Sequence, residues 1–225
     1  MTLRSAVDST PDQRRDQMLV AAAVLIAERG FSETRIADVA ERVGASPALV
    51  IYYFGTKDRL LTEALRYSEQ TFYAAAENML ARTLSLRRRL EILVGLTCVP
   101  QGDDDALGSW GLWFDLWAQA FRQPQVKQDR IELDQRWRTM IQRVVEDAIR
   151  TKEVVDVDAE EFAITFSCLL DGLSIQVALK DPVVDAERAL RIGMRFASRE
   201  LGFEWKPRRA ARSAGSRGRR GGSLP

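Results

Sequence analysis

Residues 34–57 read TRIADVAERVGASPALVIYYFGTK, and this stretch decides the fold of the N-terminal region. Apolar residues at helical spacing lie on both sides of the dipeptide Gly44-Ala45. A glycine ends a helix well, and Ser46-Pro47 opens the next one with an N-cap and a proline at the first helical position. Two short helices joined by so short a turn must cross at a sharp angle. This pattern is typical of a helix-turn-helix, which places its second helix in the DNA major groove.

The flanking sequence predicts a three-helix unit and the start of a larger helical body. Thr10 and Gln13 have the spacing of a capping box for a first helix that ends at Arg29. Thr34 is expected to cap the second helix. From Lys57 a long fourth helix is expected, and it would join the three-helix unit to the rest of the chain.

The third helix, residues 47–54, is expected to lie in the groove. Val50 and Phe54 are four residues apart and should anchor it to the core, which leaves its N-terminal end free to meet the bases. Residues 47–49 at that end are apolar and cannot make bidentate hydrogen bonds. They would therefore read thymine methyl groups and DNA shape.

Polar residues near this helix supply the remaining candidate contacts. Arg35 is the best candidate for a hydrogen bond to a base, and Tyr52 and Tyr53 offer hydroxyls to phosphates. Lys57 lies in the first turn of the fourth helix, where the helix dipole also attracts a phosphate. In the alternative interpretation the tyrosines only pack and the lysine is a solvated charge. The candidate DNA-binding residues are Thr34, Arg35, Ser46, Pro47, Ala48, Leu49, Tyr52, Tyr53 and Lys57.

The residue types across this unit form a specific pattern. Its members are Gly30-Phe31, Thr34, Ile36, Asp38-Val39-Ala40, Gly44-Ala45-Ser46, Tyr52-Tyr53-Phe54, Thr56-Lys57 and Leu60-Leu61. On these residues, positions 14–60 resemble the N-terminal domain of TetR-family transcriptional regulators. The resemblance implies DNA contacts at Arg35, Ala48, Tyr52, Tyr53 and Lys57. The chain departs from the family at three positions: Ile51 replaces the usual tyrosine, Tyr53 a frequent histidine, and Ala48 a frequent glycine or threonine.

Composition excludes several classes of protein. The 225 residues include no histidine, so histidine–zinc sites and Ser-His-Asp triads are absent. Cys98 and Cys168 are too few for a disulfide framework and are expected to be small buried apolar side chains rather than a redox pair. No apolar run is long enough to span a membrane, and the N-terminus lacks the apolar segment of a signal peptide. We therefore expect a cytoplasmic protein with no cofactor, no metal and no catalytic residues.

Residues 109–121 read SWGLWFDLWAQAF, an unusually aromatic segment. Trp110, Trp113, Phe114 and Trp117 have the spacing of one helix face, and Asp115 lies among them. This face is either an ordinary core surface or the wall of a ligand pocket in which aromatic rings and a carboxylate receive a cation. The two interpretations are compatible, because a pocket wall is also part of a core.

Two motifs in the second half of the chain carry another resemblance. They are WFDLWAQA at residues 113–120 with Pro124 after it, and LDGL at residues 170–173. On these motifs the second half is similar to the BetI-like subgroup of the TetR family, whose members respond to choline or betaine. The resemblance implies a small-molecule effector. The candidate ligand-binding residues are Trp110, Trp113, Phe114, Asp115, Trp117 and Asp171.

The last two predicted helices carry more apolar surface than one packed side needs. The usual consequence is a helical interface with a second copy of the chain, which would set two recognition helices about 34 Å apart on DNA. The predicted dimer-interface residues are Phe162, Phe166, Leu169, Leu173, Leu190, Met194 and Ala197. Seven basic residues and no acid follow from Lys206 onward, which predicts a disordered basic tail.

These observations predict an all-α protein of about nine helices, with an N-terminal helix-turn-helix domain and a C-terminal helical ligand-binding and dimerisation domain. The expected boundaries are 1–9 for an arm, 10–56 for the DNA-binding domain, 57–203 for the helical body and 204–225 for the tail.

The expected function is a homodimeric repressor that binds a near-palindromic operator. A small molecule, such as a polyamine or a choline-like cation, would release it from DNA. Three alternatives stay open. A hydrophobic or aromatic ligand could control an exporter or catabolic operon, or the regulator could have no small ligand. An enzyme using Asp115 and Asp171 as a carboxylate pair is disfavoured, because no other feature supports catalysis.

Overall fold

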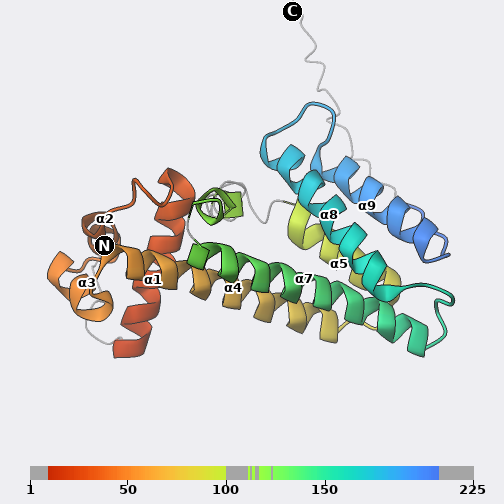
Figure 1. Cartoon of the computed structure of the whole chain (residues 1–225), viewed down its shortest axis with the longest axis horizontal. Helices are drawn as coiled ribbons and strands as arrows, with labels where there is room; N and C mark the ends of the chain where they lie inside the picture. The colour runs from red at the N-terminus through yellow and green to blue at the C-terminus, as the bar shows by residue number, and fades with distance from the viewer. Residues whose placement is uncertain (1–9, 100–110, 112, 115–116, 123, 208–225) are drawn as a thin grey trace, which may run out of the picture.

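The computed structural model describes residues 10–99, 111, 113–114, 117–122 and 124–207, and among these residues it contains helices and no strand (Figure 1). Helical residues at 111, 113–114 and 117–120 lie between α5 and α7. The helices with defined bounds are α1 (Pro11–Arg29), α2 (Ile36–Arg42), α3 (Pro47–Phe54), α4 (Lys57–Ala81), α5 (Leu86–Cys98), α7 (Pro124–Arg150), α8 (Ala159–Ala178) and α9 (Ala186–Glu200). The predicted all-α class is confirmed. The predicted N-terminal arm lies outside the described residues.

Helices α1 to α3 form the predicted three-helix unit, and its helix starts follow from the local sequence. The backbone N–H of Gln13 donates to Thr10 Oγ1 at 3.3 Å, and the N–H of Thr10 donates to Gln13 Oε1 at 3.0 Å. Ser46 Oγ accepts a hydrogen bond from the N–H of Leu49 at 3.2 Å, as its N-cap position predicts. Gly44 takes a φ of 61° in the turn between α2 and α3, a conformation that favours glycine.

The predicted cap of α2 was wrong by one residue. Arg35 is the N-cap, and its backbone N–H donates to the carboxylate of Asp38 at 3.0 Å. The hydroxyl of Thr34 instead donates to the carbonyl oxygen of Gly30 at 2.8 Å, and its side chain is buried. The carboxylate of Asp38 satisfies the backbone N–H of Arg35, so the hydroxyl of Thr34 is available to bond the carbonyl oxygen at the end of α1.

Helix α4 carries the chain from the three-helix unit into the body and runs beside α7 (Figure 1). Leu60 and Leu61 near its start are buried against the three-helix unit, and Tyr73 farther along is buried in the body. The hydroxyl of Tyr73 donates to the carbonyl oxygen of Leu133 on α7 at 2.9 Å. One helix therefore contacts both parts of the molecule.

Helices α8 and α9 pack against each other inside one chain. The rings of Phe162 and Phe166 on α8 lie 6.0 and 6.1 Å from the ring of Phe196 on α9. Of the predicted dimer-interface residues, Leu169 and Leu190 are half-buried, and five are buried within the chain itself: Phe162, Phe166, Leu173, Met194 and Ala197. These five side chains fill the space between helices of one chain, so they are not free to contact a second copy.

The outer side of α8 remains open. Ile164 is 40% exposed and Leu179 is 72% exposed. Cys98 on α5 is buried as expected, whereas Cys168 is exposed because it lies on this outer side. By length and composition α8 could cross a membrane, with a mean hydropathy of 1.3, but the same composition suits a helix that packs in a protein core.

The helical body extends slightly past its predicted end at residue 203. The indole N–H of Trp205 donates to the carboxylate of Glu91 on α5 at 3.3 Å. The guanidinium of Arg87 donates to the carbonyl oxygen of Lys206 at 2.9 Å. Residues 205–206 are thereby held on α5, and the remainder of the predicted tail, from residue 208, lies outside the described residues.

Candidate functional site

The open side of α3 brings most of the predicted DNA-binding residues together. Val50 and Phe54 have almost no exposed surface and hold α3 to the core, as predicted. The opposite side is therefore presented to solvent, and the Tyr52 side chain there is 82% exposed. On this surface Ser46, Pro47, Ala48 and Tyr52 are exposed, and Leu49 and Tyr53 are half-buried. The surface is mostly apolar and aromatic, which matches the sequence.

Two cations flank this surface. The side chain of Arg35 is exposed at the start of α2. Lys57 begins α4, and its Nζ donates to the carbonyl oxygen of Ser32 at 2.7 Å. An ammonium has three N–H donors, so two remain for another acceptor such as a phosphate. Thr34 is buried and bonded to Gly30, so it does not belong to this open surface.

A second cluster lies in the body, where α4, α7 and the aromatic segment meet. The rings of Trp113 and Phe72 are 6.2 Å apart, and Phe72 also lies 6.1 Å from Trp137 on α7. Phe114 and Trp117 are 5.8 Å apart. The structure therefore brings the predicted Trp113, Phe114 and Trp117 into one aromatic region. The other two predicted residues of the segment, Trp110 and Asp115, lie outside the described residues.

A cation already occupies part of this region. The guanidinium carbon of Arg130 lies 5.1 Å from the ring centre of Trp117 and 5.7 Å from that of Trp113. The same guanidinium pairs with the carboxylate of Asp134, one turn along α7, at 2.6 Å. Aromatic faces attract cations through the negative charge at the ring face. We call Arg130, Asp134 and the two indoles the arginine–indole cluster.

Two half-buried acids lie near this positive charge. Burial raises the pKa of Asp171 to about 6, while the charges of Arg130 and Arg138 act to lower it and that of Asp134 to raise it. Burial likewise raises the pKa of Asp134, against the opposing effect of the same two arginines. The predicted Asp171 thus lies within electrostatic reach of the cluster, and a positive charge here stabilises its ionised form.

One buried polar atom in this region has no hydrogen-bond partner among the described residues. Trp137 is 7% exposed, and its Nε1–H finds no hydrogen-bond acceptor among the described residues. A buried donor without an acceptor is costly, so native proteins usually pair such groups with protein, water or ligand. The nitrogen is therefore a candidate donor to a bound molecule.

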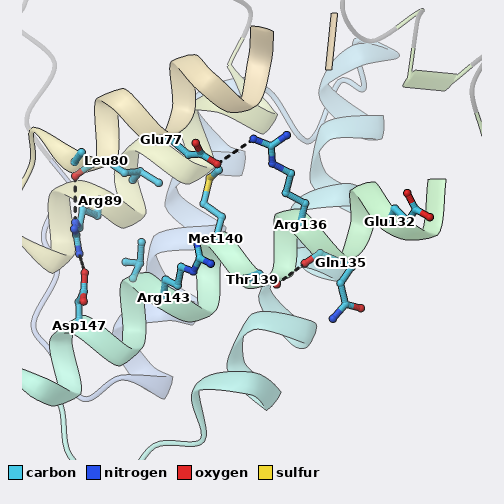
Figure 2. A pocket seen from close by; sticks show the side chains of 12 residues that line it. Glu77, Leu80, Arg89, Glu132, Gln135, Arg136, Thr139, Met140, Arg143 and Asp147 are labelled. Atoms are coloured by element: carbon cyan, nitrogen blue, oxygen red, sulfur yellow. Dashed lines mark hydrogen bonds and ion pairs between the residues drawn. The ribbon is translucent and has the colours of Figure 1, made fainter. Parts of the chain in front are cut away.

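A separate cavity of about 490 Å³ opens between α4, α5 and α7 (Figure 2). Four of its charged side chains form two ion pairs: Arg136 with Glu77 at 3.1 Å, and Arg89 with Asp147 at 2.8 Å. The guanidinium of Arg136 also lies 4.3 Å from the ring centre of Tyr73. These two ion pairs neutralise four of the charged groups that line the cavity, and Glu132 and Arg143 line it as well.

Sequence reasoning missed several members of the body site. Their helices were predicted, but helical spacing alone does not say which faces of distant helices meet. The buried arginine and its acid, four residues apart, look like an ordinary surface ion pair in the sequence. The missed residues are Phe72, Tyr73, Arg130, Asp134 and Trp137. Within the described part of the chain no group of histidine, cysteine or acidic side chains could hold a metal ion.

Known proteins share both halves of the chain. Residues 18–64 match the family model described as bacterial regulatory proteins, tetR family, and residues 86–202 match that of the BetI-type transcriptional repressor, C-terminal. The HTH-type transcriptional regulator BetI of Burkholderia thailandensis is 30% identical over 182 residues, which cover 80% of this chain and 89% of the relative.

Solved structures agree with this likeness. A transcriptional regulator from Saccharomonospora viridis in complex with choline has a TM-score of 0.75 and 28% identity, covering 84% of this chain and 98% of its own. A TetR-family regulator from Rhodococcus sp. has a TM-score of 0.70 at the same identity and the same two coverages.

Proposed function

Because this chain belongs to the TetR family of DNA-binding transcriptional regulators, with a C-terminal region of the BetI type, we propose that it binds a near-palindromic operator as a homodimer and is released by a small organic cation. The family assigns it to transcription regulation and not to enzymes. The nature of the ligand, the form of the operator and the dimer are the parts that we propose here.

The observation that supports a cationic ligand is the position of Arg130. A positive charge is held against two indole faces and within reach of two half-buried acids, Asp134 and Asp171. A site that accommodates a guanidinium has the chemistry to accept a quaternary ammonium or another amine. The choline complex of the similar S. viridis regulator supports the same class of ligand.

The DNA contact that we propose uses the open side of α3. Ala48 and its apolar neighbours would meet thymine methyl groups, while Arg35 would reach a base edge. Tyr52, Tyr53 and Lys57 would bind phosphates on either side. The exposure of Arg35, Ala48 and Tyr52 supports this assignment, as do the two N–H donors of Lys57 that have no acceptor among the described residues. Because its target is chromosomal DNA, we place the protein in the cytoplasm.

The homodimer would form through the outer side of α8. Exposed Ile164, Cys168 and Leu179 on that side offer apolar surface that the described residues leave uncovered. An interface of this kind is self-complementary in a two-fold dimer, and it would hold two α3 helices at a fixed spacing.

Release would follow from the path of α4. Phe72 and Tyr73 on this helix contact the body site, and Lys57 at its start adjoins the three-helix unit. A ligand that shifts the aromatic region would tilt α4 and change the spacing of the two recognition helices. The ligand must bind the released form more tightly for this to occur.

The test is a titration of the full chain on its operator DNA by fluorescence anisotropy. Choline and spermidine represent cations, and naphthalene represents a neutral aromatic ligand. Release by a cation, with no effect of naphthalene, supports the proposal. Release by naphthalene alone favours the second candidate, an apolar ligand on the faces of Phe72 and Trp137. Unchanged binding with all three contradicts a ligand of either class, and light scattering of the free protein tests the dimer.

A further inference from the structure

We propose that Arg130 is a built-in occupant of the cation site, so that an ammonium effector binds only by displacing its guanidinium from Trp113 and Trp117. This inference rests on the proposed function of the arginine–indole cluster as the effector site. It adds a specificity-determining residue: the protein carries its own competitor for the ligand.

The geometry of the arginine is that of a bound ligand. Its side chain is only 14% exposed, and its guanidinium lies over two indole rings while it pairs with Asp134. An arginine that served only to pair with an acid one turn away would usually remain at the surface, where such pairs contribute little. Here the planar cation is desolvated against aromatic faces, as in sites that recognise ammonium groups.

The two cations exclude each other. An ammonium group that contacts the same indole faces would occupy the space that the guanidinium fills. If both cations stayed near the rings, their positive charges would repel each other strongly, because the region is poorly solvated. Arginine has a long, flexible stem, so its head can leave the rings while its backbone stays in α7.

The internal cation sets the effector concentration at which the regulator responds. The apparent dissociation constant equals the intrinsic one divided by the fraction of molecules whose site is vacant. A guanidinium that fills the site most of the time therefore weakens effector binding, and removing it strengthens binding. An effector that instead needed the arginine, for example to bind a carboxylate on the ligand, would show the opposite dependence.

The experiment compares Arg130→Met with Arg138→Met in the full chain. Methionine retains an apolar stem of similar length and removes the charge. Arg138 is the matched control, because its charge acts on the same two acids, yet it makes no ring contact in the described part of the chain. Affinities for choline and tetramethylammonium are measured by calorimetry, and far-UV circular dichroism and melting curves establish that each variant is folded.

We expect Arg130→Met to bind both compounds about tenfold more tightly than the unmodified chain, as loss of a desolvated cation–π competitor implies. Arg138→Met should change the affinity about twofold or less. An equal gain in affinity in the two variants would show that removing any nearby positive charge strengthens cation binding, and it would overturn the inference. Weaker binding by Arg130→Met would also overturn it, because the arginine would then assist the ligand. If Arg130→Met does not fold, Arg130→Lys, a smaller and more strongly hydrated cation, replaces it with the same direction expected.

The remaining outcomes separate this inference from the proposed function. If the unmodified chain binds choline and the methionine variant binds it equally, the cation site stands and the competitor role fails. If only the variant binds, the competitor role stands, and the natural effector is not a simple ammonium ion. If neither binds, the cation site itself is absent and both proposals fail.

Discussion

The hydroxyl of Tyr73 on α4 donates a hydrogen bond to the carbonyl oxygen of Leu133 on α7, 2.9 Å away, and both residues are buried. The bond joins the helix that leads to the DNA-binding unit with the helix that carries Arg130 and Trp137. Burial raises the pKa of the tyrosine well above its usual range, so the hydroxyl stays protonated and remains a donor at any ordinary pH.

Tyr73→Phe should therefore loosen the connection between α4 and the body. Loss of one buried hydrogen bond should lower the free energy of unfolding by about 1 kcal/mol. Operator affinity should be nearly unchanged, whereas the choline concentration needed for release should rise several-fold. Thermal melting and operator anisotropy measure the two effects. An unaltered release curve would show that the bond has no part in coupling.

The raised pKa of Asp171 predicts how stability depends on pH. Its folded pKa, about 6, lies above the ordinary value of 3.8, so between these values the folded state binds more protons than the unfolded state. The contribution of Asp171 to stability should consequently fall as pH rises through this window and level off above pH 6. Asp171→Asn should remove this contribution and be more stable at pH 8 by on the order of 2 kcal/mol. Urea unfolding at several pH values measures the difference.

The same group predicts how cation binding depends on pH. An ammonium ligand favours the ionised carboxylate, so its affinity should increase as pH rises through about 6, and binding near that pH should release protons. Calorimetry in buffers of different ionisation enthalpy detects the release. Asp171→Asn should bind the cation more weakly above pH 6 and lose the pH dependence. A pH dependence that persists in this variant would assign the titration to another group, such as Asp134.

The unpartnered indole of Trp137 predicts a preference among ammonium ligands. If its Nε1–H donates to the hydroxyl oxygen of choline, Trp137→Phe should weaken choline binding about fivefold, the effect of one hydrogen bond. Tetramethylammonium has no acceptor atom and should bind this variant as it binds the unmodified chain. The ratio of the two affinities is the measurement, and an equal loss for both ligands would indicate a role in packing alone.

Lys57→Ala should weaken operator binding without changing sequence preference. The lysine bears one phosphate contact in our proposal, so the slope of log affinity against log salt should become shallower by about 1. Lys127→Ala is the matched control, because it removes an exposed lysine from α7, in the body. If both variants and the unmodified chain show equal salt slopes, Lys57 does not contact a phosphate.

Some features of the site could be predicted from sequence because they depend on neighbours in the chain. Ser46 caps α3, and Val50 and Phe54 anchor it, because capping and helical spacing act within a few residues. The cap of α2 was misplaced because Thr34 and Arg35 are adjacent and the choice depended on Asp38. Local patterns leave an uncertainty of this size at helix ends.

Features that depend on contacts between distant helices could not be predicted. The apolar spacing of Phe162 and Phe166 indicated a buried face, but only their stacking on Phe196 shows that α9 of the same chain covers it. Arg130 and Trp113 are 17 positions apart in the sequence, and no local pattern shows that the guanidinium lies over the ring.

The sequence by itself determined the helix-turn-helix, the all-α class and the family, since caps, turns and apolar periodicity act over short stretches of chain. Only the tertiary structure decided which charged group contacts the predicted aromatic face. The guanidinium of Arg130 on α7 lies over the rings of Trp113 and Trp117. The physical reason is that the packing of α4 and α7 around the aromatic region determines how far each side chain is buried and which residues it contacts. Burial then fixes both the position of the arginine and the raised pKa of Asp171.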